Sequence, residues 1–129
     1  MSSSSRSIHV PGASHNAPIP SAARVGHVIC SSAISGKDAA TGLLPADGPT
    51  QVLNAFVNMR AVLHAAGASI ADVVKLTVYL KDNALRDAIN LHWQDCFPDP
   101  DDRPARHILN YDLQHGMQLQ LEVMAVTQS

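Results

Sequence analysis

The fold is decided by the run Val73-Val74-Lys75-Leu76-Thr77-Val78-Tyr79-Leu80. β-Branched residues dominate this run and its side chains alternate in character, which predicts a β-strand. The preceding segment predicts an amphipathic helix that begins near Thr50, a good N-cap, and ends at Gly67. The following segment predicts a second helix, which Asn83 caps and Pro98 ends.

The outer segments predict four more strands, at residues 8–10, 27–32, 106–112 and 117–126. A turn at Gly116 separates the last two of these strands. Residues 13–24 contain Pro18 and Pro20 and show little periodicity, so we expect an ordered loop there. The Gly- and Pro-rich segment 36–49 is expected to form a second loop. The order of elements is therefore ββ-helix-β-helix-ββ.

This order predicts an α+β fold, a two-layer sandwich in which one mixed β-sheet carries both helices on one face. The second face of the sheet is then uncovered, and self-association would bury it. A length of 129 residues fits a single domain, residues 1–129, that can bury a core without a metal or a disulfide. Residues 1–7 are rich in serine and are expected to be flexible.

The balance of charges argues against two common classes of partner. The chain has 9 Lys and Arg residues and 11 Asp and Glu residues, which give a formal net charge of −2. Nucleic acids and anionic membranes usually require a basic face, so neither is expected as a partner. The sequence shows no apolar signal core and no stretch of ~18 apolar residues. We therefore expect a cytoplasmic protein.

The two cysteines, Cys30 and Cys96, are too few for a disulfide framework. We expect Cys30 to be a buried strand residue and Cys96 to lie on a helix face, because free cysteine packs as a small apolar side chain. Unpaired thiols indicate a reducing compartment. The 7 histidines and these cysteines do not have the spacing of a zinc site, so no metal is expected.

The stretch Arg103-Pro104-Ala105-Arg106 places a guanidinium at a turn that proline stiffens. A guanidinium is planar and can bind a carboxylate through two parallel hydrogen bonds. Arg106 is therefore a candidate ligand for a small organic acid. The alternative is a surface arginine paired with one of three nearby acids, Asp101, Asp102 or Asp112.

The last predicted strand alternates strictly between apolar and polar side chains. Its apolar face carries Leu119, Leu121 and Val123, and its polar face carries Gln118, Gln120 and Glu122. A polar face on a final strand, shortly after the arginine, indicates the lining of a site for a small acid.

Six segments, taken in order, match the pattern of a known protein family. They are Gly26 with the strand that leads into Ser32; Gln51, Asn58 and Ala65-Ala66-Gly67; residues 72–82; Asn90 and Phe97; Pro104-Ala105-Arg106; and residues 121–126. With these segments, residues 17–127 resemble the Rid family of reactive-intermediate deaminases, also called YjgF-like or endoribonuclease L-PSP.

The resemblance implies a chorismate-mutase-like fold assembled as a homotrimer, with active sites in clefts between subunits. It implies hydrolysis of enamines and imines derived from amino acids to 2-keto acids and ammonia, without a metal or an organic cofactor. Arg106 corresponds to the arginine that binds the substrate carboxylate, and Ser32 to the serine that lines the pocket. Two positions depart from the family's deaminases: Ile19 replaces a tyrosine and makes the pocket more apolar, and Gln120 replaces the first acid of a Glu-x-Glu pair.

Imine hydrolysis requires a bound carboxylate, a positioned water and a group that transfers protons. Gln120 does not titrate, but its amide can orient water; the alternative is a polar residue at a subunit contact. Glu122 lies on the same strand face and is a candidate for proton transfer, or else a structural acceptor. Ser32 is either a hydrogen-bonding group of the pocket or a strand end. His107, next to Arg106, lines the expected pocket and is a candidate proton shuttle.

A rival hypothesis is a binding module of the same fold that has lost deaminase activity and serves as a sensor or chaperone for a small carboxylate. The substitutions at Ile19 and Gln120 favour this alternative. RNA cleavage is suggested only by the family's older name, and the net charge of −2 argues against it.

Overall fold

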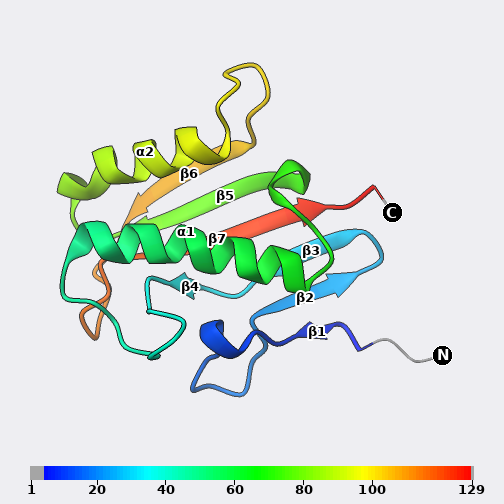
Figure 1. Cartoon of the computed structure of the whole chain (residues 1–129), viewed down its shortest axis with the longest axis horizontal. Coiled ribbons are helices and arrows are strands. Elements are labelled where there is room, and N and C mark those ends of the chain that lie inside the picture. Colours follow the sequence, from blue (N-terminus) through cyan, green and yellow to red (C-terminus); the bar gives the residue numbers. More distant parts are fainter. Residues whose placement is uncertain (1–4, 129) are drawn as a thin grey trace.

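The computed structural model describes residues 5–128, in which two helices lie across one face of a single mixed β-sheet (Figure 1). The strands are β1 (Ser7–Ile8), β2 (Ala22–Val25), β3 (Val28–Ser31), β4 (Ile34–Ser35), β5 (Val73–Leu80), β6 (Ala105–Asn110) and β7 (Leu119–Val126). The helices are α1 (Gly48–Ala65) and α2 (Arg86–Cys96), with 3₁₀ turns η1 (Pro11–Ala13), η2 (Ile70–Asp72) and η3 (Asn83–Leu85). This arrangement confirms the predicted two-layer α+β sandwich.

The last strand of the chain, β7, lies inside the sheet. The strand order is β1-β2-β3-β7-β5-β6, and β4 also pairs with β7. β5 runs parallel to β6 and antiparallel to β7. The parallel pair is connected through α2, because parallel neighbours require a crossover. The turn at Gly116 therefore joins two strands that do not pair with each other, since β5 lies between them.

The predicted loop at residues 13–24 is in part a strand. Its last residues belong to β2 (Ala22–Val25), which pairs with both β1 and β3. Val25 pairs with Val28 across a two-residue turn in which Gly26 has a φ of 61°. Alanine has little preference for strands, so the sequence carries no clear signal for β2. Pairing on both sides, which local propensity does not report, forms this strand.

Two expectations, a flexible N-terminal segment and the lack of a membrane span, can be compared with the described residues. The serine-rich residues 1–4 lie outside the described part of the chain. Ser7, which was grouped with them, is instead the first residue of β1. Neither helix within residues 5–128 has the length and apolar character needed to span a bilayer.

The helices begin at residues other than the predicted caps. Asp47 caps α1 and accepts a hydrogen bond from the Thr50 amide at 2.9 Å, so Thr50 lies inside the first turn. The carboxylate is the better cap because it also interacts favourably with the helix dipole. α2 begins at Arg86, and Asn83 lies in the preceding 3₁₀ turn. The end of α1 is as predicted, since Gly67 follows it with a φ of 82°.

The core lies between the helices and the sheet, and alternate strand residues enter it. In β7 the buried residues are Leu119, Leu121, Val123 and Ala125. Their neighbours Gln120 and Glu122 are half-buried on the other face, which we call the open face of the sheet. The alternation predicted for the last strand is confirmed.

Cys30 does not occupy the predicted buried position. It is exposed on the open face, because its neighbour Ile29 takes the core position in β3. Cys30 pairs with Met124, which is also exposed. Cys96 lies half-buried on α2, in agreement with its predicted place on a helix face.

A buried amide on α1 ties the helix to the start of β7. Gln51 is 1% exposed, and its Nε2 donates to the carbonyl oxygens of Pro45 at 2.7 Å and Gly116 at 3.1 Å. Its Oε1 accepts a hydrogen bond from the Gln118 amide at 2.9 Å. One side chain therefore joins the loop before α1 to the turn at Gly116 and to Gln118, the residue just before β7.

Replacing Gln51 by leucine should lower the free energy of unfolding by about 3 kcal/mol. Leucine has a similar volume but leaves buried backbone groups without partners, at ~1–3 kcal/mol for each unsatisfied group. Urea denaturation measures the loss. Gln94→Leu, at an exposed position of α2, is the matched control and should change the unfolding free energy by less than ~0.5 kcal/mol. Equal effects of the two substitutions would show that the Gln51 hydrogen bonds do not stabilise the fold.

Candidate active site

Arg106 lies on β6, at the edge of the sheet, with its side chain on the helix side. The register pairs it with Leu76, a core residue, and paired residues share a face. Its Nη1 donates to Oδ1 of Asn90 on α2 at 2.9 Å. Its Cζ lies 5.0 Å from the ring centre of Trp93, also on α2. The amide and the indole together hold the guanidinium plane in one orientation.

The charge of Arg106 is not neutralised by any acid in the described part of the chain. No acid among residues 5–128 forms a salt bridge with it. Burial lowers the pKa of Arg106, and the positive charge of Arg86 lowers it further. An arginine nevertheless stays protonated in proteins. The site therefore presents an oriented positive charge that can bind an anion.

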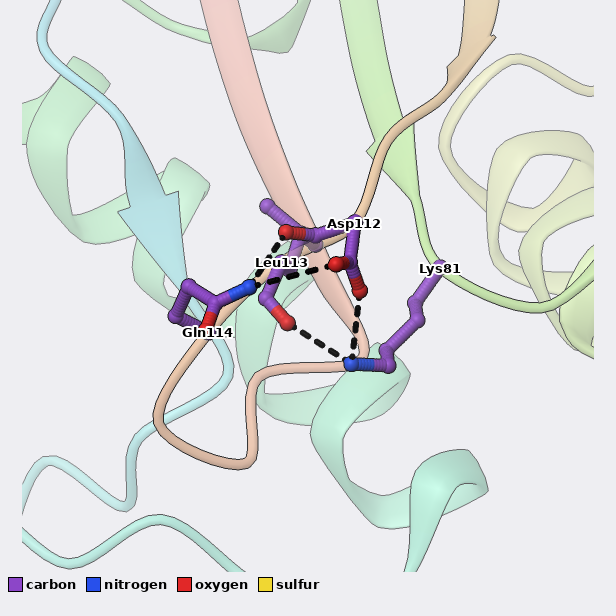
Figure 2. A network of polar contacts seen from close by, with 4 residues as sticks. All are labelled: Lys81, Asp112, Leu113 and Gln114. Carbon is purple, nitrogen blue, oxygen red and sulfur yellow. Dashed lines mark hydrogen bonds and ion pairs between the residues drawn. The ribbon is translucent and has the colours of Figure 1, made fainter.

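The acid nearest in sequence after Arg106 has a different partner, as Figure 2 shows. Asp112 Oδ1 accepts a hydrogen bond from Lys81 Nζ at 3.2 Å, and the same ammonium donates to the Leu113 carbonyl at 2.8 Å. Gln114 Nε2 donates to the backbone carbonyl of Asp112 at 3.0 Å. The ion pair between Arg106 and Asp112, considered as an alternative from the sequence, is not formed.

The candidate catalytic residues lie on the open face, opposite to Arg106. The register aligns His107 with Thr77 and Thr77 with Glu122, so the three form a row across β6, β5 and β7. Gln120 pairs with Tyr79 in the neighbouring row. The structure thus gathers His107, Gln120 and Glu122 on one surface.

Tyr79 is a residue of this surface that sequence reasoning did not select. A hydrogen bond to Glu122 raises the pKa of the Tyr79 phenol, and the negative charge of Glu122 and burial raise it further. The Tyr79 ring also meets the Tyr111 ring edge-on, with centroids 6.3 Å apart. A tyrosine in an alternating strand is explained by strand propensity alone, so the sequence gives no signal for this contact.

Gln120 also lines a cavity of about 190 Å³ beside β7. Its Nε2 donates to Met117 Sδ at 3.1 Å, so Oε1 is the atom that can accept a hydrogen bond from water. His15, Lys37 and Asn58 line the same cavity. His15 and Lys37 come from segments expected to be loops, and neither was selected from the sequence.

Ser32 and Ile19 are not brought to Arg106 within the protomer. The Ser32 hydroxyl donates to the Pro20 carbonyl at 2.9 Å and so holds the N-terminal segment against the end of β3. Ile19 is 46% exposed in that segment. In the sheet, β7 and β5 separate β3 from β6, which carries Arg106.

Within one protomer the candidate site residues therefore lie on two opposite faces of the sheet. The Arg106 guanidinium, the candidate carboxylate ligand, is at the helix-side edge, and the groups that can orient water or transfer protons are on the open face. Within residues 5–128 no cluster of three or more His, Cys, Asp or Glu side chains is suited to a metal ion.

Comparison with known proteins identifies the family. Proteins described as endoribonuclease L-PSP match residues 14–127. A RutC family protein of Haemophilus influenzae is 30% identical over 112 residues, which cover 84% of this chain and 86% of that protein. The 2-iminobutanoate/2-iminopropanoate deaminase of Escherichia coli is 36% identical over 58 residues, 45% of each chain.

The fold agrees with this assignment. The crystal structure of Escherichia coli TdcF with bound serine matches with a TM-score of 0.86 at 25% identity, covering 96% of this chain and 100% of that one. The resemblance seen in the six sequence segments is thereby confirmed, and the chain belongs to the endoribonuclease L-PSP family, which includes the YjgF and RidA proteins.

Proposed function

We propose that this protein hydrolyses small imines and enamines derived from amino acids, with release of 2-keto acids and ammonia. The observation that carries the proposal is the Arg106 guanidinium. It is half-buried, it is oriented by Asn90 and Trp93, and it has no acidic partner in residues 5–128. An oriented planar fork of this kind suits the carboxylate that such substrates carry.

We place the site between subunits, because one protomer holds the required groups on opposite faces of its sheet. Arg106 faces the helix layer, whereas Gln120 and Glu122 face the open side. The open face also exposes Met124 (41%) and Val126 (39%), which association would bury. A homotrimer in which the β6 edge of one protomer meets the open face of the next brings these groups together.

In the proposed reaction Arg106 holds the carboxylate and Gln120 Oε1 orients the attacking water. The water oxygen bonds to the imine carbon while the C=N π electrons move to nitrogen, which takes a proton. The resulting carbinolamine loses ammonia as the carbonyl forms. Glu122, which raises the pKa of the neighbouring Tyr79 phenol, and His107 in the same row are two groups on this face that can transfer protons.

The N-terminal segment contributes the pocket wall in this proposal. Ser32 anchors that segment through Pro20, and the exposed Ile19 offers an apolar surface where the family's deaminases carry a phenol. An apolar wall accommodates a larger aliphatic substrate side chain than a phenol does.

Two relatives support this class of substrate. One is named for its action on 2-iminobutanoate and 2-iminopropanoate, and the TdcF crystal structure contains serine. Both kinds of molecule carry a carboxylate next to a carbon–nitrogen bond. The family description also names an endoribonuclease, but a net charge of −2 offers little attraction for a phosphate backbone.

One observation favours a second candidate function, binding of a small carboxylate without turnover. Gln120 cannot accept a proton, and its Nε2 is bonded to Met117 Sδ. The protein would then act as a sensor or chaperone that binds through Arg106. Gln120→Glu distinguishes the two functions: a gain of ammonia release from an inactive native protein identifies a binding module, whereas turnover by the native protein excludes it.

Arg106→Lys should lower kcat/KM for ammonia release by about 100-fold. Lysine keeps the positive charge but loses the two-point fork, and ~2–3 kcal/mol of charge-assisted hydrogen bonding corresponds to this factor. The measurement follows keto acid and ammonia from imino acids generated in place by an amino-acid oxidase, against spontaneous hydrolysis in buffer.

The matched control is Arg60→Lys, on the exposed side of α1, which should retain native activity. Native activity in Arg106→Lys would contradict the role of the guanidinium. Rates equal to buffer for the native protein, with every imino acid tested, would contradict the proposed function itself.

Mixing two inactive variants tests whether the site is shared. Arg106→Ala lacks the carboxylate ligand, and the double variant Gln120→Ala/Glu122→Ala lacks the groups of the open face. Random assortment in a homotrimer gives each shared site roughly a quarter chance of receiving intact groups from both neighbours, so an equimolar co-refolded mixture should recover roughly a quarter of native activity. Size-exclusion chromatography should show trimers. No recovery would place both sets of groups in one protomer.

A further inference from the structure

A small polar cavity lies between β7 and the N-terminal segment. Its volume of about 190 Å³ is several times the ~30 Å³ share of one water molecule, so it can hold a small organic acid together with water. The polar side chains of its wall include the imidazole of His15, the ammonium of Lys37 and three amides, those of Asn16, Asn58 and Gln120.

Lys37 gives this cavity a positive charge. In the described part of the chain, no acid forms a salt bridge with its ammonium, and no Asp or Glu lines the cavity. The backbone that carries Lys37 is held in place by α1, because Asn58 Nδ2 donates to the carbonyl oxygens of Ser35 and Lys37, both at 2.9 Å. The ammonium therefore extends from an anchored segment.

The surroundings of His15 favour its neutral imidazole. Burial lowers the pKa of His15, and the positive charge of Lys37 lowers it further. The other titratable neighbour is His9, which shares with His15 a depression on the outer side of the segment, and no acid lines that depression within residues 5–128. A neutral imidazole has one nitrogen that can accept a proton.

Gln120 faces the same cavity with a group that complements this imidazole. Its Oε1 can orient a water molecule but cannot accept a proton from it. His15 can accept a proton, and both side chains line this one cavity. Two residues thus divide between them the tasks that one carboxylate would perform.

We propose that His15 is a catalytic residue of this protein, the general base that deprotonates the water held by Gln120 in this cavity. The inference rests on the proposed deaminase function and adds the identity of its base. Lys37 acts through His15, because its charge adds to the effect of burial in favouring the neutral imidazole, and its positive potential also favours anionic substrates.

The proton transfers balance over the reaction. As the water oxygen bonds to the imine carbon, His15 takes a proton from the water and the nitrogen receives the C=N electron pair and a proton from solvent. The nitrogen then takes the proton held by His15, and the C–N bond breaks with its electron pair on the departing ammonia. The hydroxyl proton returns to solvent as the carbonyl forms, and His15 is neutral again.

His15→Gln should lower kcat for imine hydrolysis by about 100-fold with little change in KM, the low end of the effect of losing a general base. In the native protein kcat should fall on the acid side, with a midpoint below the ordinary histidine value of ~6.5, because the base must be unprotonated. The variant should lose this acid limb. His9→Gln lies in the same segment but outside the cavity wall and is the matched control. It should keep the native kcat and the same fall of kcat at acidic pH.

Lys37→Met supplies a second readout that a merely structural histidine would not show. Removing the positive charge makes protonation of His15 easier, so the acid limb should move to higher pH while the rate on the plateau changes less. Urea denaturation of each variant checks that it is folded.

The outcomes separate this inference from the proposed function. A native protein no faster than buffer overturns both. Native turnover with an unaffected His15→Gln variant, or an acid limb that does not move in Lys37→Met, overturns the role of His15 alone. In that case the assignment of Arg106 stands on its own test.

Discussion

The buried amide of Gln51 forms the hydrogen bonds that attach the segment before β7 to helix α1. They join the loop before α1 to the turn at Gly116 and to Gln118, the residue just before β7. Because side chains alternate along a strand, a slip of one residue would turn Gln120 and Glu122 into the core and Leu121 out of it. The alternation and the strand pairing set this register, and the Gln51 hydrogen bonds support it by fixing the residues just before β7.

The alternation of side chains along β6 and β7 also places a positive and a negative side chain on opposite faces of the sheet. Arg106 lies on the helix side with Asn90 and Trp93, whereas Glu122 lies on the open face beside Tyr79. On a shared face the long arginine side chain could reach across β5 to the carboxylate, and such an ion pair would compete with a ligand. The cost of the separation is that one protomer cannot bring both groups to one small molecule. An active site that uses both therefore calls for a second subunit, which is the basis of the proposed shared site.

Strong periodic patterns were enough to predict most of the fold. The run 73–80, the apolar stripe before Gly67 and the alternation of residues 118–123 each have a period that only one kind of element satisfies. The weak points were local and specific. β2 carries alanines with little strand preference, Asp47 was a better cap than Thr50, and Cys30 faces outward because Ile29 takes the core position. In each of these three cases the outcome depended on neighbouring residues, and the type of the residue alone does not predict it.

The amino-acid sequence by itself determined the class of fold, the family pattern and the choice of Arg106, since these depend on periodicity and on short motifs. Only the tertiary structure decided which face each group occupies and which groups meet. The partnership of Tyr79 with Glu122 comes from the pairing of β5 with β7, and the cavity shared by His15 and Gln120 from the packing of a loop against the last strand. These contacts join residues far apart in the chain, and their formation depends on pairing and packing over the whole sheet, which no local pattern encodes.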